Sequence, residues 1–210
     1  MTAKLPFSAV LLAGGDSKRI GTNKAFLELK GKPLIDIIFW KLEKLFSEVI
    51  IVTECIEKLS YLPAKLTSDI YNEGEKNPLR GIHAGLSLST APSSFVVACD
   101  MPFISHPLIR YMSHFALNFD VVVPQYGTYY QPLFAFYNKT TLEAIVQALV
   151  NREYKVARIY AQLNVKKIHN NVIQSFDPCY LSFFNVNSKE DYLKAKEYYS
   201  ERSNTSFQLG

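Results

Sequence analysis

Neither of the two most common phosphate-binding motifs occurs in this sequence of 210 residues. The GxxxxGK(S/T) spacing of P-loop NTPases is missing, and so is the GxGxxG pattern of dinucleotide-binding domains, which removes the main support for both classes. Cysteine is scarce: the three cysteines lie far apart without a CxxC pair, so we expect buried thiols rather than disulfides or a structural zinc site. The four histidines form no HExxH or HxH cluster, which argues against a histidine metal site.

Long apolar runs and concentrations of one charge are also missing. No apolar run approaches the roughly 20 residues that span a bilayer, and residues 1–7 hold no long apolar stretch of a signal peptide. The formal net charge is +4, with 23 Lys and Arg mixed among 19 Asp and Glu, and there is no dense basic stripe. We therefore expect a cytoplasmic protein that has no membrane or nucleic-acid partner and whose ligands are small anions.

Apolar segments and amphipathic segments alternate along the chain. Expected strands are 9–13, 49–53, 65–68, 95–98, 121–124, 133–136 and 165–169, and helical spacing of apolar residues lies between them at 34–45, 82–86 and 142–149. This alternation predicts a single-domain α/β fold: a Rossmann-like, mostly parallel sheet flanked by helices on both faces, with ligands at the carboxyl ends of the strands. We expect this domain to cover residues 1–199, followed by a polar tail, 200–210, that frays.

The clearest functional signal follows the first expected strand. That strand ends in Gly14 and Gly15, which lack a Cβ and allow backbone N–H groups to approach a ligand. Arg19 and Lys24 add positive charge on the same loop, where a polyanion such as a nucleoside triphosphate would meet the sheet. These features predict a phosphate-binding loop. The alternative is a glycine-rich turn followed by a solvated basic segment.

Asp100 is the second signal. It stands where the apolar segment 95–99 ends, so it lies beside the glycine loop if the two strands are near each other in the sheet. A hard oxygen ligand at this place suits Mg²⁺, which takes one or two carboxylates and fills its octahedron with phosphate oxygens and water. The alternative role, capping the helix expected at Pro107, is disfavoured because Asp100 is too far from that helix start.

Five segments resemble the signature of the nucleotidyltransferases, and specifically of the molybdenum cofactor guanylyltransferases. They read LAGGDSKRIGTNK at 12–24, KGKPL at 30–34, NPLRGI at 77–82, ACDMPFI at 98–104 and FNVNSKED at 184–191, so the resemblance spans nearly the whole chain. The chain departs from the family pattern at Asn23, where Asp is usual, and at Asn77, where Gly is usual. An arginine-rich turn near position 154 is represented only by Arg152, Lys155 and Arg158.

The resemblance implies an enzyme that transfers GMP from GTP to molybdenum-bound molybdopterin, forming the guanine dinucleotide cofactor and pyrophosphate. It implies nucleotide-binding residues at Leu12, Ala13, Gly14, Gly15, Lys24, Asp69, Gly81 and Asp100, and pterin-binding residues at Asn185 and Asn187. Catalysis is expected to use Lys24 near the α-phosphate, Arg19 toward the pyrophosphate and Mg²⁺ on Asp100. Molybdoenzyme apoproteins or their chaperones are further expected partners.

Several residues in these segments keep a second interpretation. Asp69 can accept hydrogen bonds from guanine or a ribose hydroxyl, or it can form a turn. Arg80 occupies a variable position and is expected to be solvated. Asn185 and Asn187 share one face if their segment is extended, whereas Asn187 or Ser188 can instead cap the following helix.

Three other functions remain open from the sequence: a related transferase that uses CTP, one that acts on a sugar phosphate or polyol phosphate, and a non-catalytic carrier of the molybdenum cofactor or GTP. Sugar-directed relatives tend to be longer than this chain. The presence of Arg19, Lys24 and Asp100 together favours catalysis over carriage, because a carrier does not need a metal at the α-phosphate.

Overall fold

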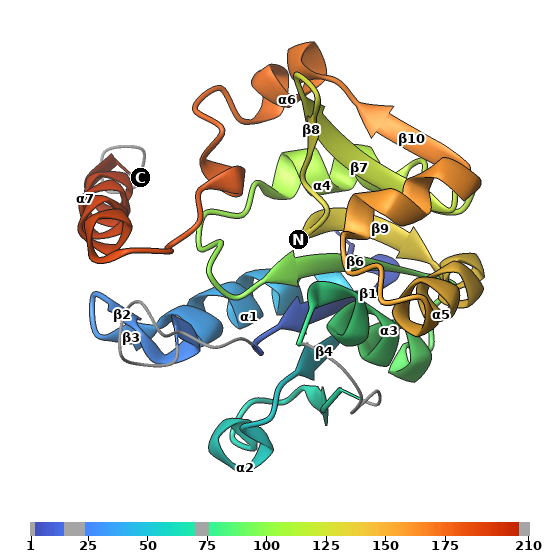
Figure 1. Ribbon diagram of the computed structural model, residues 1–210. Helices are drawn as coiled ribbons and strands as arrows, with labels where there is room; N and C mark the ends of the chain where they lie inside the picture. The colour runs from blue at the N-terminus through green and yellow to red at the C-terminus, as the bar shows by residue number, and fades with distance from the viewer. Residues whose placement is uncertain (1–2, 15–23, 70–75, 206–210) are drawn as a thin grey trace.

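A central eight-stranded sheet organises the molecule. The computed structural model describes residues 3–14, 24–69 and 76–205, with side chains up to residue 200. The strands of the sheet are β1 (Leu5–Leu12), β4 (Phe46–Val52), β5 (Lys65–Thr67), β6 (Ser93–Ala98), β7 (Val121–Tyr126), β8 (Tyr129–Tyr130), β9 (Phe134–Asn138) and β10 (Val165–Ile168). They follow the order β10-β7-β9-β6-β1-β4-β5, with β8 paired to β7 (Figure 1). A separate hairpin consists of β2 (Glu28–Leu29) and β3 (Lys32–Pro33).

Most of the long strands run in the same direction. β1 pairs in parallel with β4 and β6, β4 with β5, and β7 with β10, whereas β9 runs antiparallel between β6 and β7. Buried residues fill β1 almost without interruption, as expected of a strand that is covered on both faces. The mostly parallel α/β fold expected from the sequence is therefore confirmed, with β9 as an antiparallel addition.

The connections create a switch point between β1 and β6. From β1 the chain moves outward to β4 and β5, and it then returns through α3 (Pro78–Leu88) to β6 on the other side of β1. In open parallel sheets, ligands bind in the crevice at such a point, outside the carboxyl ends of the strands. The fold therefore directs attention to the ends of β1 and β6.

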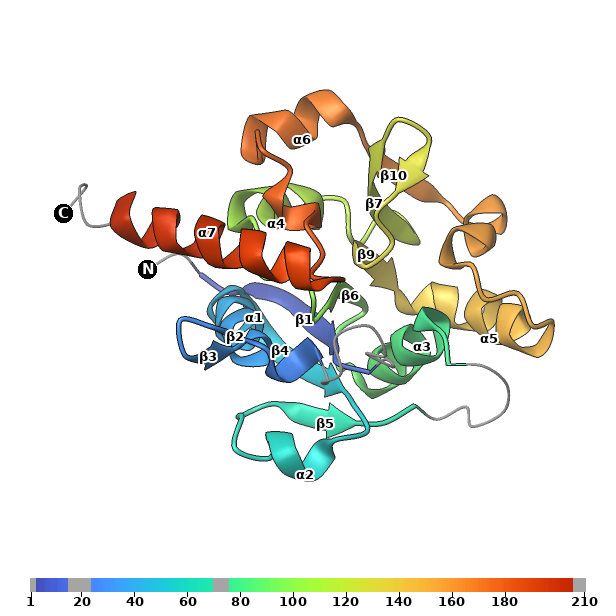
Figure 2. The same ribbon diagram turned by 60° about the vertical axis from the view of Figure 1, so that its left-hand side comes forward.

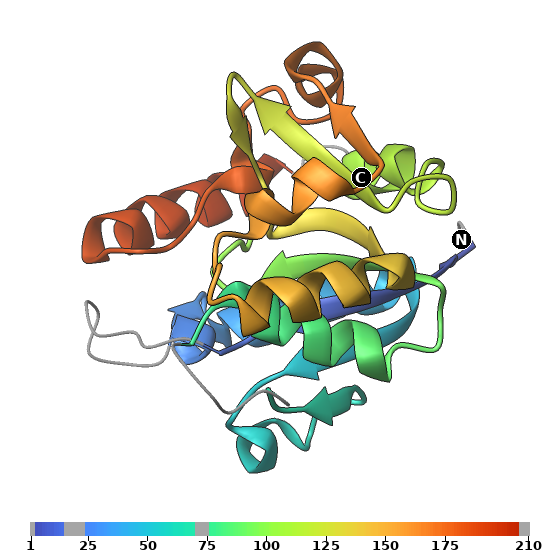
Figure 3. The ribbon, with the colours of Figure 1, turned by 45° about the vertical axis from the view of Figure 1, so that its right-hand side comes forward.

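Helices cover both faces of the sheet. On one face, α1 (Leu34–Leu45), α4 (His106–Ser113) and α6 (Asn170–Phe176) pack on a shared apolar core with β1, β4 and β6. On the other face, α3 and α5 (Leu142–Val150) lie next to each other, as Figure 3 shows, and share a second core with η3 (Val156–Gln162). The remaining short helices are α2 (Ile56–Leu59), η1 (Lys24–Phe26), η2 (Lys139–Thr141) and η4 (Leu181–Phe183).

Helix α7 (Lys189–Thr205) begins with a reciprocal cap. Ser188 Oγ accepts a hydrogen bond from Asp191 N at 3.1 Å, and Asp191 Oδ2 accepts one from Ser188 N at 2.8 Å. Ser188, rather than Asn187, is therefore the capping residue. The helix continues through residue 200 to Thr205, and residues 206–210 lie outside the described part of the chain.

A third apolar cluster attaches α7 to the rest of the molecule. Ala195 on α7 and Val186 just before it are fully buried against Leu34 on α1 and Phe103 after β6. Figure 2 shows α7 extending along the side of the molecule that carries α1, β2 and β3. This packing brings the segment before α7 to the carboxyl end of β6.

The cysteines are less uniformly buried than expected. Cys99 is buried, and burial raises the pKa of its thiol to about 12, but Cys55 is half-buried and Cys179 is exposed. The expectation of three buried thiols is therefore wrong for two of them. Within the described part of the chain, no helix has the length and apolar character needed to cross a membrane.

Candidate active site

The carboxyl ends of β1 and β6 bring two predicted site residues to one edge. Leu12 and Ala98 are partners in the parallel ladder, and the next hydrogen bond runs from Cys99 N to Leu12 O at 3.0 Å. Gly14 and Asp100 each follow one of these partners by two positions, so they leave adjacent strands at the same edge. This edge is the switch point where the fold predicts a ligand.

Asp100 carries a buried carboxylate that its described neighbours satisfy only in part. Its side chain is 18% exposed, and Oδ2 lies 3.3 Å from Nζ of Lys24. Oδ1 is buried and has no hydrogen-bond partner among the described residues. Burial raises the pKa of the Asp100 carboxyl above its ordinary value, and the Lys24 ammonium opposes this shift without cancelling it. A buried charge with an unpaired oxygen is costly for folding, so it points to a functional role.

The alternative role of Asp100, capping α4, belongs to another residue. Ser105 precedes α4, and its Oγ accepts a hydrogen bond from Leu108 N at 3.4 Å. The carbonyl of Asp100 instead accepts a hydrogen bond from Val186 N at 2.9 Å. Because Val186 is fully buried, this bond fixes the segment before α7 beside Asp100.

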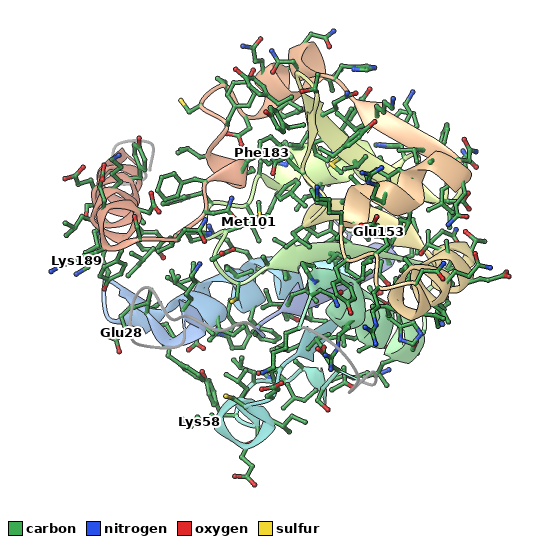
Figure 4. All side chains as sticks on the ribbon, viewed as in Figure 1. Glu28, Lys58, Met101, Glu153, Phe183 and Lys189 are labelled. Carbon is green, nitrogen blue, oxygen red and sulfur yellow. The ribbon has the colours of Figure 1, made fainter. Side chains whose placement is uncertain are left out.

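Lys24 joins the loop after β1 to both of these segments. Its Nζ pairs with Asp100, and it also donates a hydrogen bond to Oδ1 of Asn187 at 2.5 Å. Three parts of the chain that are distant in sequence therefore meet at one ammonium group. Figure 4 labels Met101, which directly follows Asp100 in the sequence, and Lys189, which begins α7.

The two asparagines predicted to bind a pterin have different surroundings. Asn187 faces Lys24, and its backbone N–H donates to Oδ2 of Asp191 at 3.1 Å. The Nδ2 of Asn185 donates to the carbonyl of Phe183 at 2.9 Å, so part of its amide is used within its own segment. The described contacts therefore bring Asn187, and not Asn185, to Lys24.

Asp69, Gly81 and Leu12 meet where α3 begins. A Cβ added to Gly81 would lie 3.0 Å from Cδ2 of Leu12 and 3.8 Å from Oδ1 of Asp69. One turn later, a Cβ at Gly85 would lie 2.2 Å from Cγ1 of Val10. Glycine at both positions thus allows α3 to approach β1 closely, and this approach places Gly81 at the carboxyl end of β1.

Arg80 is buried beside Asp69, although the sequence predicts a solvated side chain at this position. Its side chain is only 6% exposed, and its Nε lies 3.4 Å from Oδ2 of Asp69. Asn77 caps α3 by accepting a hydrogen bond from Arg80 N at 3.3 Å, which fixes the backbone at this point. The expectation of a solvated Arg80 is therefore wrong, because the side chain is folded onto Asp69.

Some predicted site residues cannot be placed. Gly15, Arg19 and Asn23 lie outside the described residues, so their expected roles remain predictions. Ala13 is described: its N–H donates to the carbonyl of Val52 at 2.9 Å and extends the ladder of β1. Gly14 is the last described residue before the gap.

The surroundings of Asp100 fit a divalent cation that is shared with a phosphate ligand. Within residues 3–14, 24–69 and 76–205, no group of three or more His, Cys, Asp or Glu side chains could hold a metal ion. A buried carboxylate oxygen without a protein donor is, however, a suitable ligand for Mg²⁺, which completes its coordination with phosphate oxygens and water. The donor set therefore suits a cation that arrives with a nucleotide.

Comparison with known sequences relates the chain to one group of enzymes. The sequence profile of the MobA-like NTP transferase domain matches residues 9–168. A protein of Natranaerobius thermophilus named "Probable molybdenum cofactor guanylyltransferase" is 36% identical over 195 residues, which cover 91% of this chain and 95% of that protein. The molybdenum cofactor guanylyltransferase of Desulfosudis oleivorans is 33% identical over 193 residues, which cover 90% and 94% of the two chains.

Solved structures show the same architecture. The molybdopterin-guanine dinucleotide biosynthesis protein A of Archaeoglobus fulgidus matches with a TM-score of 0.82 at 27% identity, over 93% of this chain and 100% of that chain. The 4-diphosphocytidyl-2C-methyl-D-erythritol synthase of Anaerococcus prevotii matches with a TM-score of 0.67 at 15% identity, over 93% and 96% of the two chains. The second likeness concerns the fold alone.

Proposed function

The chain belongs to the MobA-like NTP transferases, and we infer that it is a molybdenum cofactor guanylyltransferase whose reaction takes place in the crevice between β1 and β6. In this reaction, an oxygen of the phosphate on molybdenum-bound molybdopterin attacks the α-phosphorus of GTP. The new P–O bond forms, the bond to the β-phosphate breaks, and pyrophosphate leaves. The attacking phosphate is anionic at neutral pH, so the reaction requires no protein nucleophile.

One observation carries this proposal: the ammonium of Lys24 contacts both Asp100 and Asn187. The triphosphate is assigned to the Asp100 side, because Gly14 and Asp100 leave the sheet at the same edge. The acceptor phosphate is assigned to the Asn187 side. Lys24 then lies between donor and acceptor, where a fixed positive charge stabilises the negative charge that develops during transfer.

Asp100 is the residue that would hold Mg²⁺ together with the phosphate oxygens of GTP. When bound, this cation supplies charge neutralisation at the phosphates. Lys24 exchanges its pairing with Asp100 for contact with the nucleotide, and Arg19 is assigned to the leaving pyrophosphate. The positive charges of Lys24 and Arg19 then balance negative charge on the phosphates.

The other predicted site residues are divided between the nucleotide side and the pterin side of Lys24. The nucleotide side comprises Leu12, Ala13, Gly14, Gly15, Asp69 and Gly81, and the pterin side comprises Asn185 and Asn187. We also propose a cytoplasmic location, a single catalytic domain over residues 1–199, and delivery of the product to molybdoenzyme apoproteins or their chaperones.

Transfer of label tests this function. The purified protein is incubated with Mg²⁺, the molybdenum-loaded pterin and GTP, CTP or ATP labelled at the α-phosphate. We expect label in the dinucleotide product, unlabelled pyrophosphate, and transfer from GTP at least about tenfold faster than from CTP or ATP. Faster transfer from CTP would replace the proposal by a cytidylyltransferase, and binding of GTP without any transfer would replace it by a carrier.

A further inference from the structure

The ion pair between Arg80 and Asp69 has no part in the phosphate chemistry proposed above. Arg80 lies in the first turn of α3 and is 6% exposed, and Asp69 follows β5 and is 22% exposed. Buried ion pairs contribute little net stability, because the desolvation of both charges offsets their attraction. Stability alone is therefore a weak reason for this pair to lie at the edge of the sheet where the nucleotide binds.

The two oxygens of Asp69 face different surroundings. Oδ2 lies 3.4 Å from Nε of Arg80, whereas the described residues offer Oδ1 no hydrogen-bond donor. Oδ1 lies 3.8 Å from the point where a Cβ on Gly81 would stand, and Cδ2 of Leu12 lies 3.0 Å from the same point. Leu12 therefore packs closely against Gly81, and Oδ1 of Asp69 lies beside this contact at the carboxyl end of β1.

We propose that Arg80 is a positioning residue of the nucleotide site: it pairs with Oδ2 of Asp69, so that Oδ1 stays on the side of Gly81 and accepts a hydrogen bond from the nucleoside. This inference rests on the proposed function, because it requires a nucleoside at the carboxyl end of β1. Two kinds of donor have the right chemistry, the 2-amino group of guanine and the ribose hydroxyls. The 3.4 Å contact is an ion pair and not a hydrogen bond, and arginine presents its charge in a planar group, which the ammonium of lysine does not.

The electrostatics of Asp69 favour the same role. Burial raises the pKa of the Asp69 carboxyl above its ordinary value, and the nearby Arg80 guanidinium lowers it. Without Arg80, the pKa of Asp69 would lie higher still, and a protonated carboxyl would donate a hydrogen bond where an acceptor is needed. Arg80 therefore maintains the acceptor character of Asp69 as well as its orientation.

Calorimetric titration with GTP and three analogues tests the inference without the pterin substrate. ITP lacks the 2-amino group of guanine, and 2′-deoxyGTP and 3′-deoxyGTP each lack one ribose hydroxyl. We expect the wild type to bind one analogue about tenfold more weakly than GTP, as the loss of a hydrogen bond to a charged group predicts, and that analogue identifies the donor. In Asp69→Asn and Arg80→Gln, the ratio of the affinity for GTP to the affinity for that analogue should fall to about twofold or less. Arg80→Lys should give an intermediate ratio, because it keeps the charge but not the planar group.

Arg110→Gln is a matched control, because Arg110 is an arginine on α4 whose Nη2 donates to Ala3 O at 3.0 Å. It should retain the wild-type ratio. An Arg80→Gln protein that retains the ratio while Asp69→Asn loses it would overturn the positioning role and leave the nucleotide site intact. If thermal unfolding shows that Arg80→Gln does not fold, a full wild-type ratio in Arg80→Lys would overturn the role instead.

Different results would overturn the proposed function and this inference. A wild type that binds GTP and all three analogues equally would overturn the inference even if it transfers GMP to the pterin. Absence of that transfer in the labelling assay would overturn the proposed function, whatever the analogue ratios are.

Discussion

Two carboxylates at opposite ends of the parallel strands have very different surroundings. Glu48 lies near the amino end of β4, and Asp100 lies just beyond the carboxyl end of β6. Burial acts to raise the pKa of both groups. At Glu48, hydrogen bonds from its neighbours outweigh burial and lower the pKa to about 2, whereas at Asp100 burial prevails and the pKa is raised.

At the amino ends of the strands, hydrogen-bond donors surround the carboxylate of Glu48. Nζ of Lys65 donates to Oε1 at 2.5 Å, and Thr90 donates through Oγ1 to Oε1 at 3.1 Å and through its N–H to Oε2 at 3.0 Å. The hydroxyl of Ser8 also donates to Oε2, and Ser89 donates to Ser8 at 2.8 Å. Both carboxylate oxygens are therefore satisfied by protein groups.

At the carboxyl ends of the strands, the carboxylate of Asp100 is satisfied only in part. Asp100 has Lys24 near one oxygen and no hydrogen-bond partner for the other within the described residues. A fold in which Glu48 is fully hydrogen-bonded can tolerate an unfavourable charge at Asp100, since total stability is a sum over both. The comparison supports the proposal that Glu48 serves the fold and Asp100 serves the reaction.

The largest effect is expected from Asp100→Asn, which should separate activity from stability. GMP transfer should fall by about 10³-fold, because an amide does not supply the charge that a hard cation requires. A carboxyl whose folded-state pKa is raised destabilises the folded protein as pH rises through that pKa, so at neutral pH the variant should unfold at the same or a higher urea concentration than the wild type. Clear destabilisation of the variant at neutral pH would show that Asp100 serves the fold, as Glu48 does, and would contradict the contrast drawn between the two residues.

Lys24→Ala should have the next largest effect. Turnover should fall by about 10²-fold, because the variant lacks a preorganised charge between donor and acceptor phosphates, and the melting temperature should change little. Lys194→Ala is a matched control, because Lys194 pairs only at the surface with Glu190 on α7, at 2.7 Å. Turnover of Lys24→Ala equal to that of this control would remove Lys24 from the mechanism.

Glu48→Gln should have the smallest effect, and it should concern stability alone. The free energy of unfolding at pH 7 should decrease by about 1–2 kcal/mol, the size of hydrogen bonds to a charged group after allowance for solvent screening. The folded-state pKa of about 2 lies below the ordinary value of 4.5, so Glu48 stabilises the fold fully above that value and loses its contribution as pH falls toward 2. Urea unfolding at pH 7 and at about pH 3 measures this. A difference between wild type and variant that does not shrink at the lower pH would contradict the assignment.

The central part of the site could be predicted because the fold class brings strand ends together. Gly14 and Asp100 each follow an apolar strand, and a parallel sheet places such residues at one edge. The burial of Arg80 could not be predicted in this way. It depends on Asp69, which belongs to another segment, and on the close approach of α3 to β1 that Gly85 allows. The apolar residues on both sides of Arg80 in the sequence were the available signal.

Two features of the fold escaped prediction for different reasons. The apolar segment of β9 has the same pattern in either direction, so its antiparallel pairing with β6 depends on tertiary structure. Helix α7 continues past residue 200 although the sequence there is polar. Its position is set by Ala195 and Val186, which pack on residues from distant segments, and not by a strong apolar stripe of its own.

Binding of the Mn²⁺ complex of GTP to the wild type, Asp100→Asn and Glu48→Gln, compared with binding of GTP in the presence of a chelator, measures directly whether Asp100 holds the cation. We expect Asp100→Asn to bind the complex at least about tenfold more weakly than the wild type does, because the proposed ligand to the cation is missing. Binding of metal-free GTP should be unchanged or slightly tighter in that variant, since the carboxylate that repels the triphosphate is gone. Glu48→Gln should match the wild type in both titrations. Equal affinity of the wild type and Asp100→Asn for the complex would show that the cation is held elsewhere and would contradict the account.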